Sequence, residues 1–197
     1  MRLIDAWTRL RSKNPVAAAV TLEASCGELT LSDAFSYYQW RASGTPIRGM
    51  EKDGKTYYFT DNAVCDENGR TVSASAAGNL DLANLLDIAL MNMENTEFEC
   101  RQDDTASVYT FRLNQAGMEQ LVHGVFPKAE KLEISGEKGS ILLRIADGSL
   151  QSVEITCDGS GKLLTAAVDI GLSLKDQLQN DRPGPELPDA VRQALEK

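Results

Sequence analysis

Apolar and polar residues alternate along much of this chain, which is the pattern of β-strands that bury one face. In the stretch 16–26, VAAAVTLEASC, the residues Val20, Leu22 and Ala24 alternate with polar neighbours. The stretch 162–174 repeats this pattern, with Leu164, Ala166, Val168, Ile170, Leu172 and Leu174 at every second position. We count about nine to eleven such strands, which predicts a fold built mainly from a sheet.

Short Gly-containing turns separate the predicted strands. In KDGK at 52–55 and DENGR at 66–70, a Gly follows Asp or Asn, which is the chemistry of tight hairpins. ELTL at 28–31 and AFSYYQWRAS at 34–43 are predicted as two strands. The segments KLEIS, ILLRI, LQSVEITC and KLLTAAVDIGLSL are predicted as four more, joined by the turns EKGS, ADGS and CDGSG. Turns this short require antiparallel neighbours.

Helical periodicity interrupts the strands at four places. The spacing of apolar residues predicts short helices over 3–13 and 116–126, and a Pro/Gly-rich linker precedes another at the C-terminus. The most apolar helix is LDLANLLDIALMNM at 80–93, in which Leu82, Leu85, Leu86, Ala89 and Met93 share one face. Its wide apolar stripe predicts contacts on more than one side.

Together these elements predict an α+β fold. We expect a single large, strongly curved antiparallel sheet, an incomplete β-barrel, with helices covering its concave face. One domain is expected over residues 1–175, followed at 176–197 by a linker and a short C-terminal helix that packs on, or trails, the same domain. An apolar concave face closed by a helix would form a pocket.

The charge of the chain excludes one class of partner. Among its 197 residues, 29 acidic and 20 basic side chains give a net charge of −9. This field repels phosphate backbones, and no Lys/Arg cluster offsets it, so we expect no nucleic-acid binding. The N-terminal segment lacks the apolar core of a secretory signal. Two alternatives stay open: a cytosolic protein, or an exported one whose signal or anchor has been removed.

Residues with catalytic or metal-binding chemistry are few. Cys26, Cys65, Cys100 and Cys157 form no CxxC pair, and the single His123 completes no zinc site with them by local spacing. The cysteines are either disulfide partners in an exported protein or small buried residues. His123 lacks a recognisable nucleophile or orienting partner nearby. We therefore expect no enzyme activity, no metal and no cofactor.

Aromatic residues gather on two neighbouring predicted strands. The segment 51–72 contains three consecutive rings, Tyr57, Tyr58 and Phe59, and Trp40 lies on the strand before it. On an extended strand, Tyr57 and Phe59 face one way and Tyr58 the other. One set can line the concave face while the other packs outward or against a helix, and Trp40 can join either set. Each ring can instead belong to an ordinary core.

Several segments resemble the lipoprotein-carrier superfamily. These segments are VAAAVTLEA at 16–24, DGKTYYF at 53–59, LANLLDIAL at 82–90 and LLRIADGSLQSVEIT at 142–156. The superfamily contains the periplasmic lipoprotein localisation factor LolA and the mycobacterial lipid-binding lipoproteins, and the helix GMEQLVHGVFP is more similar to the latter. The likeness spans about residues 3–175. It implies a half-barrel that holds acyl chains, contains no catalytic residue and functions outside the cytoplasm after removal of a signal or anchor.

The resemblance gives a first hypothesis for function. The chain would be an extracytoplasmic, non-catalytic protein, in the cell envelope or secreted, that carries or senses a lipid or a lipoprotein acyl chain. Its partner would be a hydrophobic small molecule or an acylated protein, with a removed N-terminal anchor placing the monomer near a membrane. The residues expected to contact the ligand are Trp40, Tyr57, Phe59, Leu85, Leu86, Ala89, Met93, Val153, Ile155 and Val168. The alternative is a cell-envelope interaction or regulatory domain whose cavity is filled by side chains.

Overall fold

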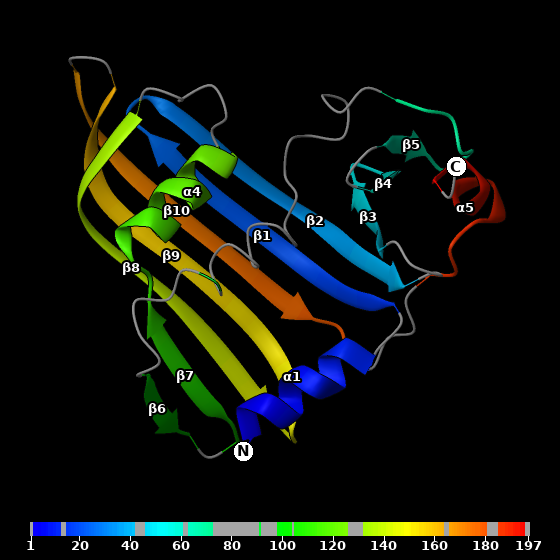
Figure 1. Ribbon diagram of the computed structural model, residues 1–197, viewed down its shortest axis with the longest axis horizontal. Helices are drawn as coiled ribbons and strands as arrows, with labels where there is room; N and C mark the ends of the chain where they lie inside the picture. The colour runs from blue at the N-terminus through cyan, green and yellow to red at the C-terminus, as the bar shows by residue number, and fades with distance from the viewer. Residues whose placement is uncertain are drawn as a thin grey trace.

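The chain folds into one wide antiparallel sheet with short helices packed against it (Figure 1). The computed structural model describes residues 2–12, 15–41, 46–60, 63–72, 91, 98–103, 105–125, 132–163, 166–180 and 185–195. The strands are β1 (Val16–Cys26), β2 (Leu29–Arg41), β3 (Pro46–Lys52), β4 (Lys55–Phe59), β5 (Val64–Asp66), β6 (Glu99–Gln102), β7 (Ser107–Arg112), β8 (Leu132–Ala146), β9 (Ser149–Leu163) and β10 (Ala166–Leu178). The helices are α1 (Arg2–Ser12), α4 (Gln115–Val125) and α5 (Asp189–Leu195).

The sheet consists of two meanders joined at its centre. In the described part of the chain the strand order is β5-β4-β3-β2-β1-β10-β9-β8-β7-β6, and every pair is antiparallel. The first and last strands of the order are not paired with each other, so the sheet is not closed. The predicted fold class, a single large antiparallel sheet that forms an incomplete barrel, is confirmed.

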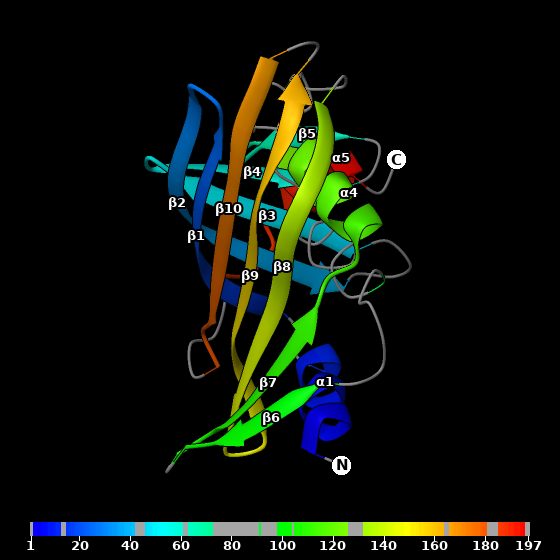
Figure 2. The same ribbon diagram turned by 90° about the vertical axis from the view of Figure 1, so that its left-hand side faces the viewer.

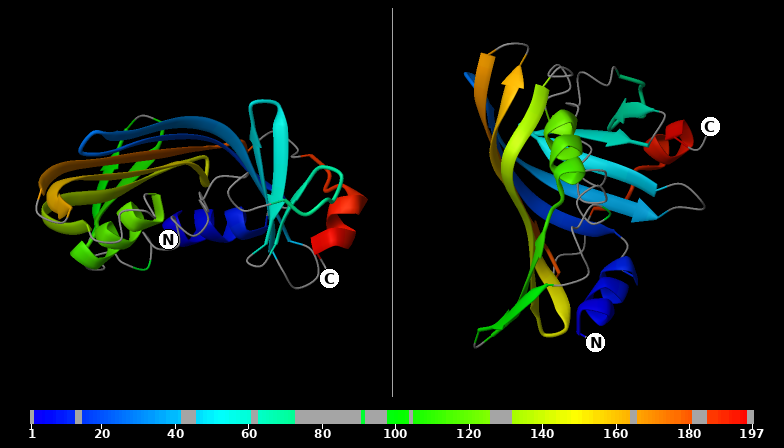
Figure 3. Two further views of the ribbon diagram at one scale, coloured as in Figure 1. Left: turned by 90° about the horizontal axis from the view of Figure 1, so that it is seen from above. Right: turned by 60° about the vertical axis from the view of Figure 1, so that its left-hand side comes forward.

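The sheet bends strongly, so that it has an inner, concave face and an outer, convex face (Figures 2 and 3). We define the inner face as the one that carries the side chains of Leu22 and Ile155. Ala6 of α1 and Leu121 of α4 are buried in the same hydrophobic cluster as these two residues. Both helices therefore pack against the inner face. The helix predicted over 80–93 lies outside the described residues apart from Met91, which is helical and exposed, so its predicted role as a cover stays a prediction.

Several predicted elements are confirmed. The strand over 16–26 has the predicted bounds, and its burial alternates as the apolar pattern requires. The helices predicted over 3–13 and 116–126 correspond to α1 and α4. Asn114 caps α4, because its Oδ1 accepts a hydrogen bond from the amide of Gly117 at 2.8 Å. The KDGK hairpin forms with Asp53 and Gly54 at positive φ, as a tight turn demands.

Other predicted strand boundaries are wrong. The two strands predicted over 28–31 and 34–43 form one continuous strand, β2. The polar residue Asp33 does not interrupt this strand, because its carboxylate pairs with Lys52 of the neighbouring strand β3. The turns predicted at EKGS and CDGSG lie within β8 and β9. At EKGS, a register shift between Ser135 and Lys138 absorbs the irregular residues as a bulge, so the strand continues. The CDGSG segment stays extended because β9 pairs there with two long strands, β8 on one side and β10 on the other.

Helix α5 lies on the opposite side of the sheet from α1 and α4 (Figure 3). It packs on the outer face of β3, β4 and β5, where it completes a second hydrophobic cluster, the outer cluster. The buried members of the outer cluster are Trp40, Ile47, Tyr58, Cys65, Leu187 and Val191. The predicted C-terminal helix therefore packs on the sheet, and β10 extends beyond residue 175, where the domain was expected to end.

Candidate ligand-binding face

The inner face of the sheet is apolar across six neighbouring strands. Two rows of cross-strand neighbours, the inner rows, follow from the pairing register. The first row contains Phe35, Val20, Asp176, Val153, Leu143 and Tyr109, from β2 to β7. The second contains Asp33, Leu22, Leu174, Ile155, Ile141 and Phe111. Ten of these twelve positions are therefore apolar, and the two exceptions are both aspartates.

The ten apolar residues of the inner rows are buried. Leu22, Ile141 and Ile155 are each 0% exposed, and Val153 is 3% exposed. Part of this cover comes from Met118 of α4, which belongs to the same cluster. The inner face therefore has the burial and chemistry of a hydrophobic core, and it is also the surface that an apolar ligand would contact.

Asp176 is a carboxyl group in the middle of the first inner row. Its strand, β10, is central in the sheet, and its cross-strand partners are Val20 on β1 and Val153 on β9. The residue keeps some exposure, but Oδ1 is fully covered and forms no hydrogen bond with the described residues. Loss of solvation raises the pKa of Asp176 to about 7. Near neutral pH this carboxyl group therefore exists in both protonation states.

The other aspartate of the inner rows is paired. Asp33 forms an ion pair and hydrogen bond with Lys52 of β3, and the two side chains are 12% and 37% exposed. A partly buried carboxylate with a cationic partner satisfies its charge within the protein. The two inner-row carboxyl groups thus differ: one has a partner in the fold, and Asp176 has an unsatisfied oxygen.

The structure brings four of the predicted ligand-contacting residues together on the inner face. Phe59, Val153 and Ile155 are buried in its hydrophobic cluster, and Tyr57 packs against that cluster half-buried. Val168 lies at one end of β10, against a smaller cluster that contains Val122 of α4. The predicted contacts Leu85, Leu86, Ala89 and Met93 lie outside the described residues.

Trp40 lies on the other face. Its ring packs at 5.8 Å from Tyr38 and at 5.7 Å from Tyr58, and its Nε1 donates a hydrogen bond to the carbonyl oxygen of Pro185 at 2.9 Å. It therefore anchors the segment that leads into α5 and does not contact the inner face. The three consecutive rings divide between the two faces as strand geometry requires. Tyr57 and Phe59 lie on the inner face, and Tyr58 packs with Trp40 in the outer cluster.

Sequence reasoning missed Asp176, although one signal pointed to it. The alternation that places Leu172 and Leu174 inward continues to position 176. A carboxyl residue in that phase predicts an inward-facing polar group. The predicted strand ends at Leu174, so position 176 falls in the predicted linker.

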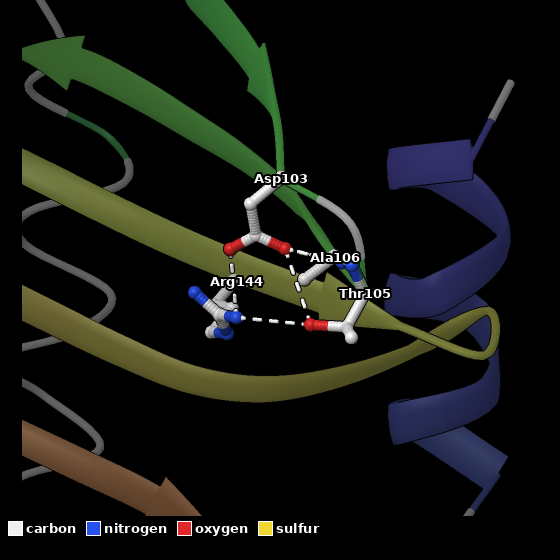
Figure 4. A network of polar contacts seen from close by, with 4 residues as sticks. All are labelled: Asp103, Thr105, Ala106 and Arg144. Carbon is white, nitrogen blue, oxygen red and sulfur yellow. Dashed lines mark hydrogen bonds and ion pairs between the residues drawn. The ribbon is translucent and has the colours of Figure 1, made fainter.

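A separate polar network holds the β6–β7 hairpin (Figure 4). Oδ1 of Asp103 accepts hydrogen bonds from the amides of Thr105 and Ala106 at 3.0 and 2.7 Å, and Oδ2 forms an ion pair with Nη2 of Arg144 at 2.8 Å. These interactions, with the amide of Thr105 the largest, lower the pKa of Asp103. The network ties the hairpin tip to β8. A hollow of about 470 Å³ lies beside it and reaches Asp147.

A larger hollow lies between residues of β7, β8 and β9 and the start of α4. It has a volume of about 630 Å³, and its lining includes Thr110, Ser140 and Thr156. The hydroxyl groups of Ser140 and Thr156 lie 2.8 Å apart and form a hydrogen bond. The lining also contains Leu113 and Met118, so it combines polar groups of the outer face with apolar side chains that belong to the cluster of the inner face.

The described residues offer little reactive chemistry. No group of three or more His, Cys, Asp or Glu side chains among them can hold a metal ion. All four cysteines are free thiols. Burial raises the pKa of Cys26 and Cys65, and raises that of Cys157 to about 12, so these three thiols are protonated at neutral pH. No described helix has the length and apolar character needed to cross a membrane.

Comparison with known proteins gives similarity of structure only. A scan against protein-family models finds no match, and neither does a search of curated proteins. Among solved structures, a domain from Vibrio parahaemolyticus assigned as an outer membrane lipoprotein-sorting protein is similar at 10% identity and a TM-score of 0.32, over 100% of this chain and 97% of that one. A DUF1329 family protein from Desulfovibrio piger ATCC 29098 is similar at 9% identity and a TM-score of 0.28, over 91% and 88%.

The first of these similarities agrees with the resemblance predicted from the sequence, which was to the lipoprotein-carrier superfamily. Both TM-scores lie below 0.5 and both identities below 25%, so neither similarity carries a conclusion about function.

Proposed function

We propose that this chain is a non-catalytic binding protein that holds a hydrophobic ligand, a lipid or an acyl chain, against the inner face of its open sheet. The observation that carries the proposal is the composition of the inner rows, ten apolar positions out of twelve across six strands. Ligand sites of this class are concave and mostly apolar, with few polar groups. The inner face is concave (Figure 3), and the inner rows contain only two polar residues, Asp33 and Asp176.

The proposal includes an extracytoplasmic location and a monomeric state. The location is supported by the resemblance to the lipoprotein-carrier superfamily alone. Fractionation of the native host, with the chromosomal copy tagged, tests the location, and recovery in the cytosolic fraction would contradict it. Light scattering of the purified protein tests the monomer.

The test of binding begins with material purified without detergent. Native mass spectrometry and solvent extraction should detect a co-purified lipid, and a fluorescent fatty alcohol should bind after delipidation. Tyr57→Ala removes a half-buried ring from the inner face and should weaken binding of the probe. Tyr38→Ala removes a half-buried ring from the outer face and is the matched control. Absence of both lipid and probe uptake would contradict the proposal.

One observation favours the alternative, a protein-interaction domain with a filled inner face. Residues such as Ile141 and Ile155 have no exposed surface, as in a sealed core. Ala18 and Ala24 on the same face are small side chains, which speak against complete filling. In this alternative, pull-down from the native cell would recover a protein partner, and the delipidated protein would not take up the fluorescent fatty alcohol.

A further inference from the structure

The first inner row is apolar except for Asp176, whose Oδ1 is covered and has no hydrogen-bond partner among the described residues. The cross-strand neighbours of Asp176 are Val20 and Val153, and its neighbours on the same face of β10 are Leu174 and Leu178. A covered polar atom without a partner is costly, and native proteins seldom keep one without a reason. The side chain therefore has an unused capacity to bind a polar group at the centre of the apolar face.

Three other carboxylates on this sheet have cationic partners. Asp33 pairs with Lys52, Asp103 with Arg144 at 2.8 Å, and Glu154 with Lys175 at 3.3 Å. Neither inner row contains a lysine or an arginine, so no cation of the rows neutralises Asp176. The net charge of the chain, −9, adds a field that attracts cations and repels anions.

We propose that Asp176 is the polar anchor of the inner face and that it selects amphiphiles whose apolar chain carries a cationic amine. This inference rests on the proposed function and names the class of its ligand. The apolar chain lies along the inner rows, and the ammonium group donates hydrogen bonds to the carboxylate and compensates its charge. A carboxylate head group would instead place two like charges together, and an alcohol would donate one neutral hydrogen bond.

The raised pKa of Asp176 supports this assignment. The free protein keeps the carboxyl group partly protonated near neutral pH because the ionised form is poorly solvated. An ammonium partner favours the ionised form, so binding of an amine is coupled to release of a proton from Asp176.

The experiment compares three probes of one chain length, dodecylamine, dodecanol and dodecanoate, each below its micellar concentration. Isothermal titration calorimetry at pH 7.5 measures binding to the wild-type protein, to Asp176→Asn and to Asp169→Asn. The Asn side chain keeps the shape of Asp176 without its charge. Asp169 lies on the same strand but is exposed on the outer face, so its substitution removes the same charge elsewhere.

For the wild-type protein we expect dodecylamine to bind about tenfold or more tightly than dodecanol, with dodecanoate the weakest, since a charged hydrogen bond of this kind is worth about one order of magnitude in affinity. Asp176→Asn should reduce the preference for the amine to about twofold or less while it keeps dodecanol binding, which also shows that the variant is folded. Asp169→Asn should keep the wild-type order.

Three results would overturn the inference while leaving the proposed function intact. These are equal binding of amine and alcohol by the wild-type protein, an unchanged preference in Asp176→Asn, or an equal loss of preference in Asp169→Asn. Failure of the proposed function has a different signature, because then the wild-type protein would bind neither dodecanol nor dodecylamine.

Discussion

The two faces of the central strands differ in composition although they share every backbone hydrogen bond. On the inner face, the row through Ile155 contains five apolar residues and Asp33. The residues one position away along each strand form a neighbouring row on the outer face, and none of them is apolar. They are Ser32, Glu23, Ser173, Thr156, Ser140 and Arg112. Pairing therefore cannot decide which face becomes the core. Side-chain alternation decides it.

Among the described residues, the buried apolar side chains of the outer face gather at one end, under α5. There the outer cluster is small and depends on a helix of seven residues, whereas the cluster of the inner face joins α1, α4 and most strands. Stability of the sheet should therefore depend mainly on the inner face. Each prediction below tests this asymmetry with a change on one face and a counterpart elsewhere.

The largest effect is expected for Ile155→Ala. Ile155 is 0% exposed, so truncation leaves a cavity in the inner face and should lower the free energy of unfolding by about 3 kcal/mol. Thr156→Ala, the next residue of β9, removes a hydroxyl group from the outer face and should cost about 1 kcal/mol. Urea denaturation measures both. Equal losses would show that the two faces contribute alike.

Asp176→Asn should stabilise the protein at alkaline pH. The native pKa of about 7 lies above the ordinary value of 3.8, so the native state holds the proton more tightly than the unfolded state. The contribution of Asp176 to stability is therefore full below pH 3.8 and is lost as pH rises to about 7. At pH 8 the variant should be more stable than the wild-type protein by on the order of 2 kcal/mol.

The control for this prediction is the same comparison at pH 4. At pH 4 the native wild-type protein has a protonated, neutral carboxyl group at position 176, and the variant has a neutral amide there. The two proteins should therefore have similar stability. Thermal unfolding followed by circular dichroism across pH 4 to 8 gives the whole curve. A constant difference at every pH would contradict the assigned pKa.

Two glycines test packing on the two faces. A Cβ atom at Gly49 would lie 2.7 Å from the ring of Trp40 on the outer face. One at Gly139 would lie 2.7 Å from Sδ of Met118 and 3.0 Å from Cβ of Leu113 on the inner face. The indole is held by its hydrogen bond to Pro185 and cannot move easily, whereas a Met side chain is flexible. Gly49→Ala should therefore cost about 1–2 kcal/mol and Gly139→Ala less, by chemical denaturation. The reverse order would contradict this account.

Much of the fold was predictable because it depends on local patterns. The alternation of 16–26 gives β1, and the consecutive rings Tyr57, Tyr58 and Phe59 divide between the faces as strand geometry requires. The boundaries within 132–163 were not predictable, because Gly and Asp residues there suggest turns. Long neighbouring strands impose the extended conformation, which is information from distant segments.

The candidate site was predictable to the same extent. Val153 and Ile155 follow from alternation, whereas the face that Trp40 occupies also depends on where α5 packs, more than a hundred residues later in the chain. Asp176 was missed because polar residues after 174 suggest that the strand ends. Pairing with both β1 and β9 continues to Gln177, so the carboxyl group is carried into the sheet.

The smallest effect is expected for Asp103→Ala in the β6–β7 hairpin, at one edge of the sheet. The side chain is exposed, but its carboxylate caps the hairpin tip and pairs with Arg144. Loss of these contacts should speed amide hydrogen exchange in β6 and β7 while exchange in β1 and β10 stays unchanged, because local opening there leaves the inner rows intact. The pH dependence has the opposite sign to that of Asp176. The pKa of Asp103 lies below its ordinary value, so its stabilisation is present above the unfolded pKa and is lost as pH falls through the native pKa. Hydrogen exchange by mass spectrometry measures the variant against the wild-type protein. Faster exchange in the central strands as well would show that the edge hairpin and the inner face unfold as one unit.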